Sequence, residues 1–295
     1  MPMKIPQRIK TLASLLLTIL VWSSAFVGIR YALQFYNPGH LILLRFLSAS
    51  VLLLILAIIR KIGFPRINDL PIFLLLGVIG FTIYNIALVN GEKTVLAGAA
   101  SMIIASAPIL TTIFVLLFWK EKLLPLGWVG SLIGFCGVAL ISFRDLGSFQ
   151  LEAGALIIFL AAICISFYNA YQKKIHQRYS ALQITVYTVL VGTIVLLIYT
   201  PGLFQAVSAA PASATLSLVY LGVFPTVIGF LSWNYALQHV SASVASSFQY
   251  LTPVFTVVIA WLWMSELPTT LTIVGGVLTV LGVIVVNTWG KQRRG

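Results

Sequence analysis

The chain has 295 residues, of which 60% are hydrophobic and only 8% are charged, whereas soluble globular domains carry about 25% charged residues. This composition excludes an ordinary water-soluble domain. The net charge of +12 comes from Lys and Arg residues that are scattered between apolar runs, which argues against a nucleic-acid partner because a nucleic-acid-binding face gathers its cations.

Ten apolar runs, bounded by charged residues, Pro or Gly, follow one another along the chain. A helix needs about 20 mostly apolar residues to cross a bilayer, and it satisfies its own backbone hydrogen bonds in lipid. We therefore predict an all-α integral membrane protein with ten transmembrane helices. In chain order they are 11–33, 38–59, 70–91, 95–118, 126–143, 153–172, 181–199, 213–236, 241–264 and 271–289.

The cations between these helices favour one orientation. With the N-terminus in the cytoplasm, fourteen Lys and Arg residues fall on the inner side, and the outer loops hold only Lys93 and Arg144. The positive-inside rule then places both termini in the cytoplasm. The inner cations are Lys4, Arg8, Lys10, Arg60, Lys61, Arg66, Lys120, Lys122, Lys173, Lys174, Arg178, Lys291, Arg293 and Arg294.

The sequence also repeats itself. Residues 77–142 align without a gap with residues 222–287, at a shift of 145. Five helices in each half is an odd number, so the second copy must enter the membrane from the opposite side. We predict two inverted five-helix repeats, 1–145 and 146–295, with a binding site near the midplane between them. The aligned pairs include Pro108 with Pro253, Glu121 with Glu266, Gly77 with Gly222, and Gly130 with Gly275.

Several of these features together resemble a known family, the ten-helix EamA-type permeases of the drug/metabolite transporter superfamily. They are Trp22–Phe26 in the first helix, Pro38 and Arg45–Phe46 in the second, and a Pro near mid-helix followed by a Glu in each half. The resemblance implies a carrier of the bacterial inner membrane, usually an exporter of amino acids or related metabolites.

Two cations lie within predicted helices. A charge inside a membrane costs about 2.5–3.5 kcal/mol on the mildest scale, so it should face the bundle interior or water. Arg45 is expected to face inward, either as an anchor for a substrate carboxylate or for the outer gate, or as a structural Arg that bonds helix-end carbonyls. Arg30 lies closer to the boundary, and its side chain is expected to reach outward.

Polar and aromatic residues gather at mid-depth in five of the predicted helices. Unpaired amides are costly in lipid, so these side chains should either line a cavity that suits a solute with a zwitterionic head or bridge neighbouring helices. For the group as a whole we favour a cavity. With Arg45, the predicted substrate-binding residues are Trp22, Ser23, Tyr84, Asn85, Tyr168, Asn169, Trp233, Asn234, Gln249 and Tyr250.

The two aligned prolines, Pro108 and Pro253, are candidate hinges, because a proline within a helix removes a backbone hydrogen bond. Static bends are the alternative reading. Rows of glycines recur at three- and four-residue steps in 126–143 and, less regularly, in 271–289. Such faces allow close helix contact, so we expect these two helices to brace the bundle rather than line the path.

The acidic residues do not indicate a proton site. Glu92 adjoins Lys93 and is expected to form a pair at the outer surface, and Glu121 and Glu266 lie near helix ends. No nucleotide-binding signature, clustered catalytic group or metal-ligand set is present, so we predict no enzyme, no cofactor and no metal.

The sequence therefore predicts an alternating-access secondary carrier that exports amino acids or related small metabolites. The alternatives are a passive facilitator or channel, and an organic-anion or sugar-phosphate exchanger. The partners are a small-molecule substrate and the lipid bilayer. A monomer suffices because the two halves already form a pseudo-dimer, although a dimer is compatible with the sequence.

Overall fold

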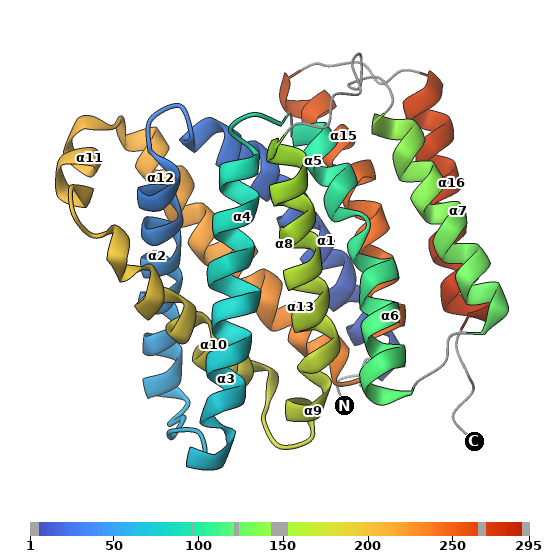
Figure 1. The fold of residues 1–295 in the computed structure, drawn as a ribbon, viewed down its shortest axis with the longest axis horizontal. Coiled ribbons are helices and arrows are strands. Elements are labelled where there is room, and N and C mark those ends of the chain that lie inside the picture. Colours follow the sequence, from blue (N-terminus) through green and yellow to red (C-terminus); the bar gives the residue numbers. More distant parts are fainter. Residues whose placement is uncertain (1–5, 96, 121–123, 143–152, 265–269, 291–295) are drawn as a thin grey trace, which may run out of the picture.

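The computed structural model describes residues 6–95, 97–120, 124–142, 153–264 and 270–290, and all regular secondary structure in these ranges is helical (Figure 1). All ten predicted segments are helical there, four of them with interruptions. Six helical stretches of the described chain are long and apolar enough to cross a membrane, and three shorter apolar helices accompany them. Glu121 and Glu266 lie outside the described residues.

Most of the uninterrupted helices begin or end at the residues that the sequence indicates. The second helix starts at Pro38, a favoured first position, and the preceding Asn37 accepts a hydrogen bond from the His40 backbone N–H (2.8 Å). A capping box of Ser180 and Gln183 starts α10. The helices are α1 (Gln7–Ala32), α2 (Pro38–Ile59), α7 (Pro125–Ser142), α8 (Ala153–Tyr171), α10 (Ala181–Leu196) and α16 (Thr270–Trp289).

Two of the predicted helices contain a π-helical segment at matching positions. In the first half, η2 (Val78–Ile83) lies between α3 (Leu70–Gly77) and α4 (Tyr84–Gly91). A shift of 145 carries it to 223–228, which falls within the second π-helical segment, η4 (Gly222–Gly229). The flanking helices there are α12 (Ala212–Leu221) and α13 (Phe230–Leu237). Such segments are rare and occur frequently at functional sites.

Another pair of predicted helices is broken, again at matching positions. The break in the first half lies at 105–106, and the shift of 145 carries it to the junction that precedes Leu251. Pro108 and Pro253 each lie in the first turn of the helix after the break, where a backbone N–H is not needed. The sequence predicted both prolines near mid-helix, whereas the structure places them near helix starts. The pieces are α5 (Ala97–Ile104), α6 (Ala107–Trp119), α14 (Ala242–Ser247), η5 (Phe248–Tyr250) and α15 (Leu251–Met264).

Helices α7 and α16 pack along each other at one edge of the molecule (Figure 1). A methyl group added at Gly137 would meet the backbone of Thr279, and one added at Gly282 would meet the backbone of Gly134. The glycine rows therefore allow the two backbones to approach closely, as the sequence predicts.

The two halves of the chain interleave in the rest of the bundle. Helix α2 packs on α10 and α12, α4 packs on α8, and α1 packs on α13 and α15. Large apolar side chains remain exposed on the outside of these helices, among them Ile58, Leu117, Ile194 and Leu216. This surface suits contact with lipid acyl chains. The remaining elements are η1 (Ile67–Asp69), α9 (Lys173–His176), η3 (Leu197–Tyr199) and α11 (Leu203–Ala209). Of these, only η3 falls within a predicted helix, 181–199.

Candidate functional site

An interior cavity of about 60 Å³ lies between helices of both halves. A volume of this size holds roughly four or five water molecules. Its walls are mostly aliphatic and aromatic, and helices α7 and α16 contribute none of the described lining residues. Four of the eleven predicted binding residues line the cavity, namely Trp22, Arg45, Tyr84 and Gln249.

Arg45 is the only charged side chain among the described lining residues, and it is 5% exposed. Its Nε donates a hydrogen bond to Thr226 Oγ1 (2.9 Å) and its Nη1 donates to Asn85 Oδ1 (3.3 Å). The third nitrogen, Nη2, makes no hydrogen bond to the described residues. Side chains, not helix-end carbonyls, thus orient the guanidinium and leave one of its amino groups available to a solute.

The π-helical segments explain why these two partners stand at Arg45. Pro225 has no N–H for the Leu221 carbonyl four residues earlier, and Thr226 Oγ1 donates to that carbonyl instead (3.0 Å). The same oxygen then accepts from Arg45. In the other half, Asn85 Nδ2 donates to the Phe81 carbonyl in η2 (2.8 Å), which turns Oδ1 toward Arg45.

Aromatic rings form one wall of the cavity. Trp22 Nε1 donates to the Pro225 carbonyl (3.0 Å), so its polar atom is already engaged and the ring faces other side chains. The ring centroid of Phe230 lies 5.1 Å from that of Trp22 and 4.5 Å from that of Phe81. This wall offers apolar contact area for a solute without further hydrogen bonds.

Gln249 and Tyr84 add polar atoms to the same cavity. Gln249 lies in η5, at the break between α14 and α15, and its Oε1 is buried without a hydrogen-bond partner. Buried polar atoms in proteins are usually paired. An unpaired amide oxygen in the wall of a cavity is therefore suited to a polar solute or to water.

The other seven predicted residues lie outside the cavity lining, and several of them bridge helices. Ser23 shares its hydroxyl proton between the carbonyls of Ile19 (2.7 Å) and Thr252 (3.1 Å). Trp233 Nε1 donates to Asn169 Oδ1 (3.0 Å). For these residues the structure favours the interhelical reading over direct contact with a solute.

Asn234 Nδ2 donates to Thr185 Oγ1 (2.8 Å) between α13 and α10. Tyr168 is fully buried, and its ring packs edge-on against Phe81. Tyr250 is also fully buried, beside Gly134. Asn85, described above, positions Arg45 instead of lining the cavity.

The whole chain can be compared with known proteins. The sequence model of the EamA-like transporter family matches residues 9–143 and again residues 152–288. The chain belongs to the EamA-like transporter family. It is a multi-pass membrane transporter rather than an enzyme.

Relatives of this EamA-like chain agree with that assignment. It is 42% identical to the uncharacterized transporter YdfC of Bacillus subtilis, over 90% of this chain and 87% of that protein. It is 35% identical to a "probable terminal-alkyne amino-acid exporter" of Streptantibioticus cattleyicolor, over 96% of each chain. A solved crystal structure shares the fold with a TM-score of 0.77 at 18% identity, and the match covers 97% of this chain and 98% of the other.

One residue of this EamA-like transporter does not lie where we expected it. Glu92 forms no surface pair with Lys93, because both of its carboxylate oxygens are buried and lack hydrogen-bond partners. The sequence indicated no buried carboxylate to support proton coupling, and Glu92 provides one. The spacing could have indicated this position, since Glu92 follows the lining residues Tyr84 and Leu88 at steps of four.

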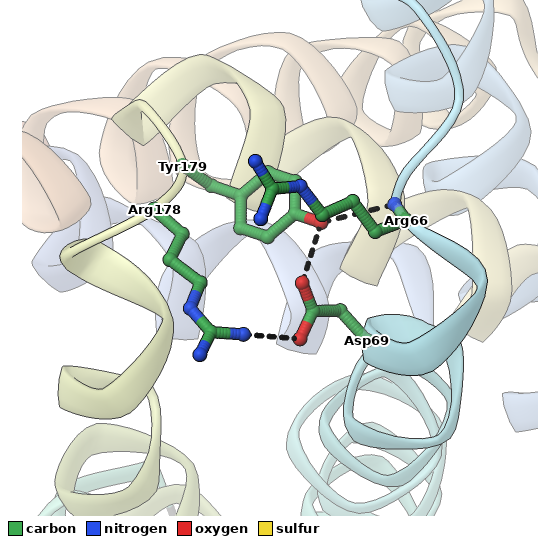
Figure 2. A network of polar contacts seen from close by, with 4 residues as sticks. All are labelled: Arg66, Asp69, Arg178 and Tyr179. Atoms are coloured by element: carbon green, nitrogen blue, oxygen red, sulfur yellow. Dashed lines mark hydrogen bonds and ion pairs between the residues drawn. The ribbon is translucent and has the colours of Figure 1, made fainter.

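At the end of the bundle opposite to Glu92, a cluster of polar residues connects the segment before α3 with the segment before α10. Figure 2 shows Asp69 between Arg178, whose Nη1 lies 3.0 Å from Oδ1, and Tyr179, whose hydroxyl donates to Oδ2 (2.9 Å). The Arg66 backbone N–H donates to the same hydroxyl (3.0 Å). We call Arg66, Asp69, Arg178 and Tyr179 the Asp69 cluster. It joins the start of α3 to the segment before α10.

Proposed function

We propose that this chain is a ten-helix secondary carrier that exports amino acids or related small metabolites across the bacterial inner membrane by alternating access. Its halves, 1–145 and 146–295, are two inverted repeats, and both termini are cytoplasmic. The observation that carries the proposal is the cavity between the halves, in which one oriented cation faces an aromatic wall.

The matching irregularities support the inverted repeat. Both π-helical segments and both helix breaks coincide at the shift of 145, and the family model matches each half once. Carriers built from inverted repeats hold their substrates near the midplane, at interrupted helices. In this chain Gln249 lies at such an interruption, and Arg45 is bonded to a residue of a π-helical segment.

The chemistry of the cavity supports the substrate class. The free amino group of Arg45 suits a carboxylate, which accepts charge-assisted hydrogen bonds from a guanidinium. Trp22 and Phe230 suit an apolar or aromatic side chain. The relative from Streptantibioticus cattleyicolor, named as a probable amino-acid exporter, makes amino acids the first class to test.

Counterflow in proteoliposomes tests the proposal. Vesicles are preloaded with one unlabelled amino acid, and the entry of labelled phenylalanine or threonine is followed. We expect saturable, preload-dependent entry. Arg45→Gln should raise KM roughly 10- to 100-fold, since losing a hydrogen bond to a charged group costs about 1.5–3 kcal/mol. Arg45→Lys should recover only part of this loss, because Lys lacks the planar fork of donors.

Arg60→Gln is the matched control, because Arg60 is exposed at the far end of the same helix and should tolerate the change. Entry that neither saturates nor depends on the preload would instead identify a passive facilitator. Exchange of phosphorylated sugars or organic anions, but of no amino acid, would overturn the substrate class.

A further inference from the structure

Glu92 stands next to the cavity but has no role in the site described so far. Tyr84 and Leu88 line the cavity from α4, and residues four apart lie on one face of a helix. Glu92 is the next residue on that face, at the end of the helix, where its N–H bonds the Leu88 carbonyl (2.9 Å). Its carboxylate is thus directed inward, one turn beyond the cavity wall.

The groups that surround this carboxylate carry positive charge or none. Arg45 of α2 and Arg30 of α1 both act on it electrostatically, and Tyr84 is the other titratable group nearby on its own helix. From helix α8, the uncharged residues Gly154 and Ile158 lie against Gly91, which directly precedes Glu92. Lys93, the next residue in the chain, is exposed.

Arg45 acts electrostatically on Glu92, yet neither carboxylate oxygen of Glu92 has a hydrogen-bond partner among the described residues. Arg45 keeps one free amino group on the cavity, and Glu92 keeps two unpartnered oxygens beyond it. A cation and an anion held apart in this way are complementary to a molecule that carries a carboxylate and an ammonium group on the same carbon.

We propose that Arg45 and Glu92 together bind the head group of a zwitterionic α-amino acid, and that Glu92 exchanges the bound ammonium group for a proton. The proposal rests on the carrier function proposed above and adds the coupling ion. In the step, the neutral carboxyl of Glu92 releases its proton to water, and the resulting carboxylate accepts hydrogen bonds from the ammonium group. The proton and the ammonium group compete for one carboxylate. Glu92 therefore holds either the substrate or a proton each time the site changes sides of the membrane, which is the condition for antiport.

The position of Glu92 suits this exchange. Burial raises the pKa of Glu92 to about 8, although the charges of Arg45 and Arg30 lower it. The carboxyl is therefore mostly protonated below that pH and ionised above it. Since only the carboxylate binds ammonium, the apparent KM for an amino acid should fall as the pH rises, by roughly tenfold for each pH unit below about 8.

A transmembrane pH gradient tests the inference. Proteoliposomes with an acidic lumen in an alkaline medium contain protons that can leave, and we expect them to accumulate labelled phenylalanine above its equilibrium level. Glu92→Gln keeps the size of the side chain but cannot exchange a proton, so gradient-driven accumulation should fall to that of protein-free vesicles. Lys93→Gln removes an adjacent exposed charge and should keep full accumulation.

A second readout follows the ammonium group itself. Wild-type protein should prefer phenylalanine to 3-phenylpropanoate, which has the same carboxylate and ring but no amino group. Glu92→Gln should lose this preference and its pH dependence, while 3-phenylpropanoate still competes for Arg45. This competition also shows that the variant is folded.

The failures are separable. If wild-type protein shows no saturable counterflow, the carrier function itself is wrong. If counterflow saturates but an acidic lumen drives no accumulation, or Glu92→Gln still accumulates phenylalanine, the coupling is wrong and the carrier function stands. Accumulation driven by an acidic medium instead would reverse the sign and overturn antiport.

Discussion

At the scale of single residues, the partners of Arg45 show how a duplicated chain forms an asymmetric site. At the shift of 145, Thr226 corresponds to Phe81, and Asn85 corresponds to Phe230. The two polar members hold the guanidinium, while the two aromatic members contact each other with ring centroids 4.5 Å apart. Each pair thus contributes one polar side chain and one ring. An asymmetric solute requires such a difference between the halves.

Thr226→Val tests the importance of this orientation. Valine keeps the shape but removes the hydroxyl, so Arg45 Nε and the Leu221 carbonyl both lose a partner. Each buried polar group left unpaired costs about 1–3 kcal/mol. We expect a lower Tm in detergent, measured by differential scanning fluorimetry, and a raised KM in counterflow.

Thr288→Val is the control for this substitution, because Thr288 is exposed and its hydroxyl bonds only to the carbonyl of Ile284 in its own helix. Its Tm and KM should match those of the wild type. An unchanged KM for Thr226→Val would show that Arg45 does not need this partner to bind the substrate.

The residues of the site were predictable only in part. Polarity in an apolar helix identifies both Gln249 and Asn169, because either costs free energy when it faces lipid. The sequence does not say which way each helix is rotated, so it cannot separate Gln249, which lines the cavity, from Asn169, which accepts a hydrogen bond from Trp233. Glu92 was misplaced because its sequence neighbour is a Lys, whereas both of its carboxylate oxygens are buried.

At the scale of elements, apolar runs located the helices but not their interruptions. The second helix, 38–59, matches its predicted range because Pro38 starts it and a charged pair, Arg60–Lys61, follows it. The π-helical segments carry no such boundary signal. The hydropathy of a segment is the same whether it forms an α-turn or a π-turn, so hydropathy alone does not locate η2 and η4. In the structure, these segments are associated with the hydrogen bonds to Arg45 and, in η4, with Pro225.

Gly222 at the start of η4 is a sensitive point of this packing. A methyl group there would meet the backbone carbonyl of Arg45 and the side chain of Ser48, so α2 and η4 would have to separate. Overpacking of this kind costs typically about 1–3 kcal/mol. We expect Gly222→Ala to lower the Tm and to weaken counterflow, because Arg45 moves with the backbone of α2.

Gly276→Ala in α16 is the matched helical control, since a methyl group there meets only Val254 at an ordinary distance. Alanine favours helix over glycine by up to about 1 kcal/mol, so this variant should be as stable as the wild type or more so. If both variants behaved alike, close contact between α2 and η4 would not be what positions Arg45.

At the scale of the whole molecule, the Asp69 cluster lies at the end of the bundle where α3 starts, whereas Tyr84 and Leu88 line the cavity farther along the same span. The described cationic residues at the start of α1, the end of α2 and in α9 lie at the same end as the Asp69 cluster (Figure 1). In the proposed orientation this end is cytoplasmic. The Asp69 cluster then joins two connecting segments at the inner side of the membrane. Alternating access requires the Asp69 cluster to open when the site is loaded from the cytoplasm.

Asp69→Asn should shift this conformational equilibrium. Arg178 is 59% exposed at its side chain, so the ion pair alone is worth about 1 kcal/mol or less, and the bond from Tyr179 weakens when its acceptor loses its charge. A total of about 1–2 kcal/mol changes a population ratio roughly 5- to 30-fold.

Spin labels at Lys61→Cys and Lys174→Cys, with Cys136 and Cys164 replaced by Ser, would report the distance across the cluster by pulsed electron paramagnetic resonance. We expect one short distance in the otherwise wild-type protein and an added longer population in Asp69→Asn. Lys10→Gln, which removes a charge at the same end but outside the cluster, should leave the short distance in place. An unchanged distribution in Asp69→Asn would mean that aromatic packing of Tyr179 on Phe73, with centroids 5.0 Å apart, closes this end without the charges.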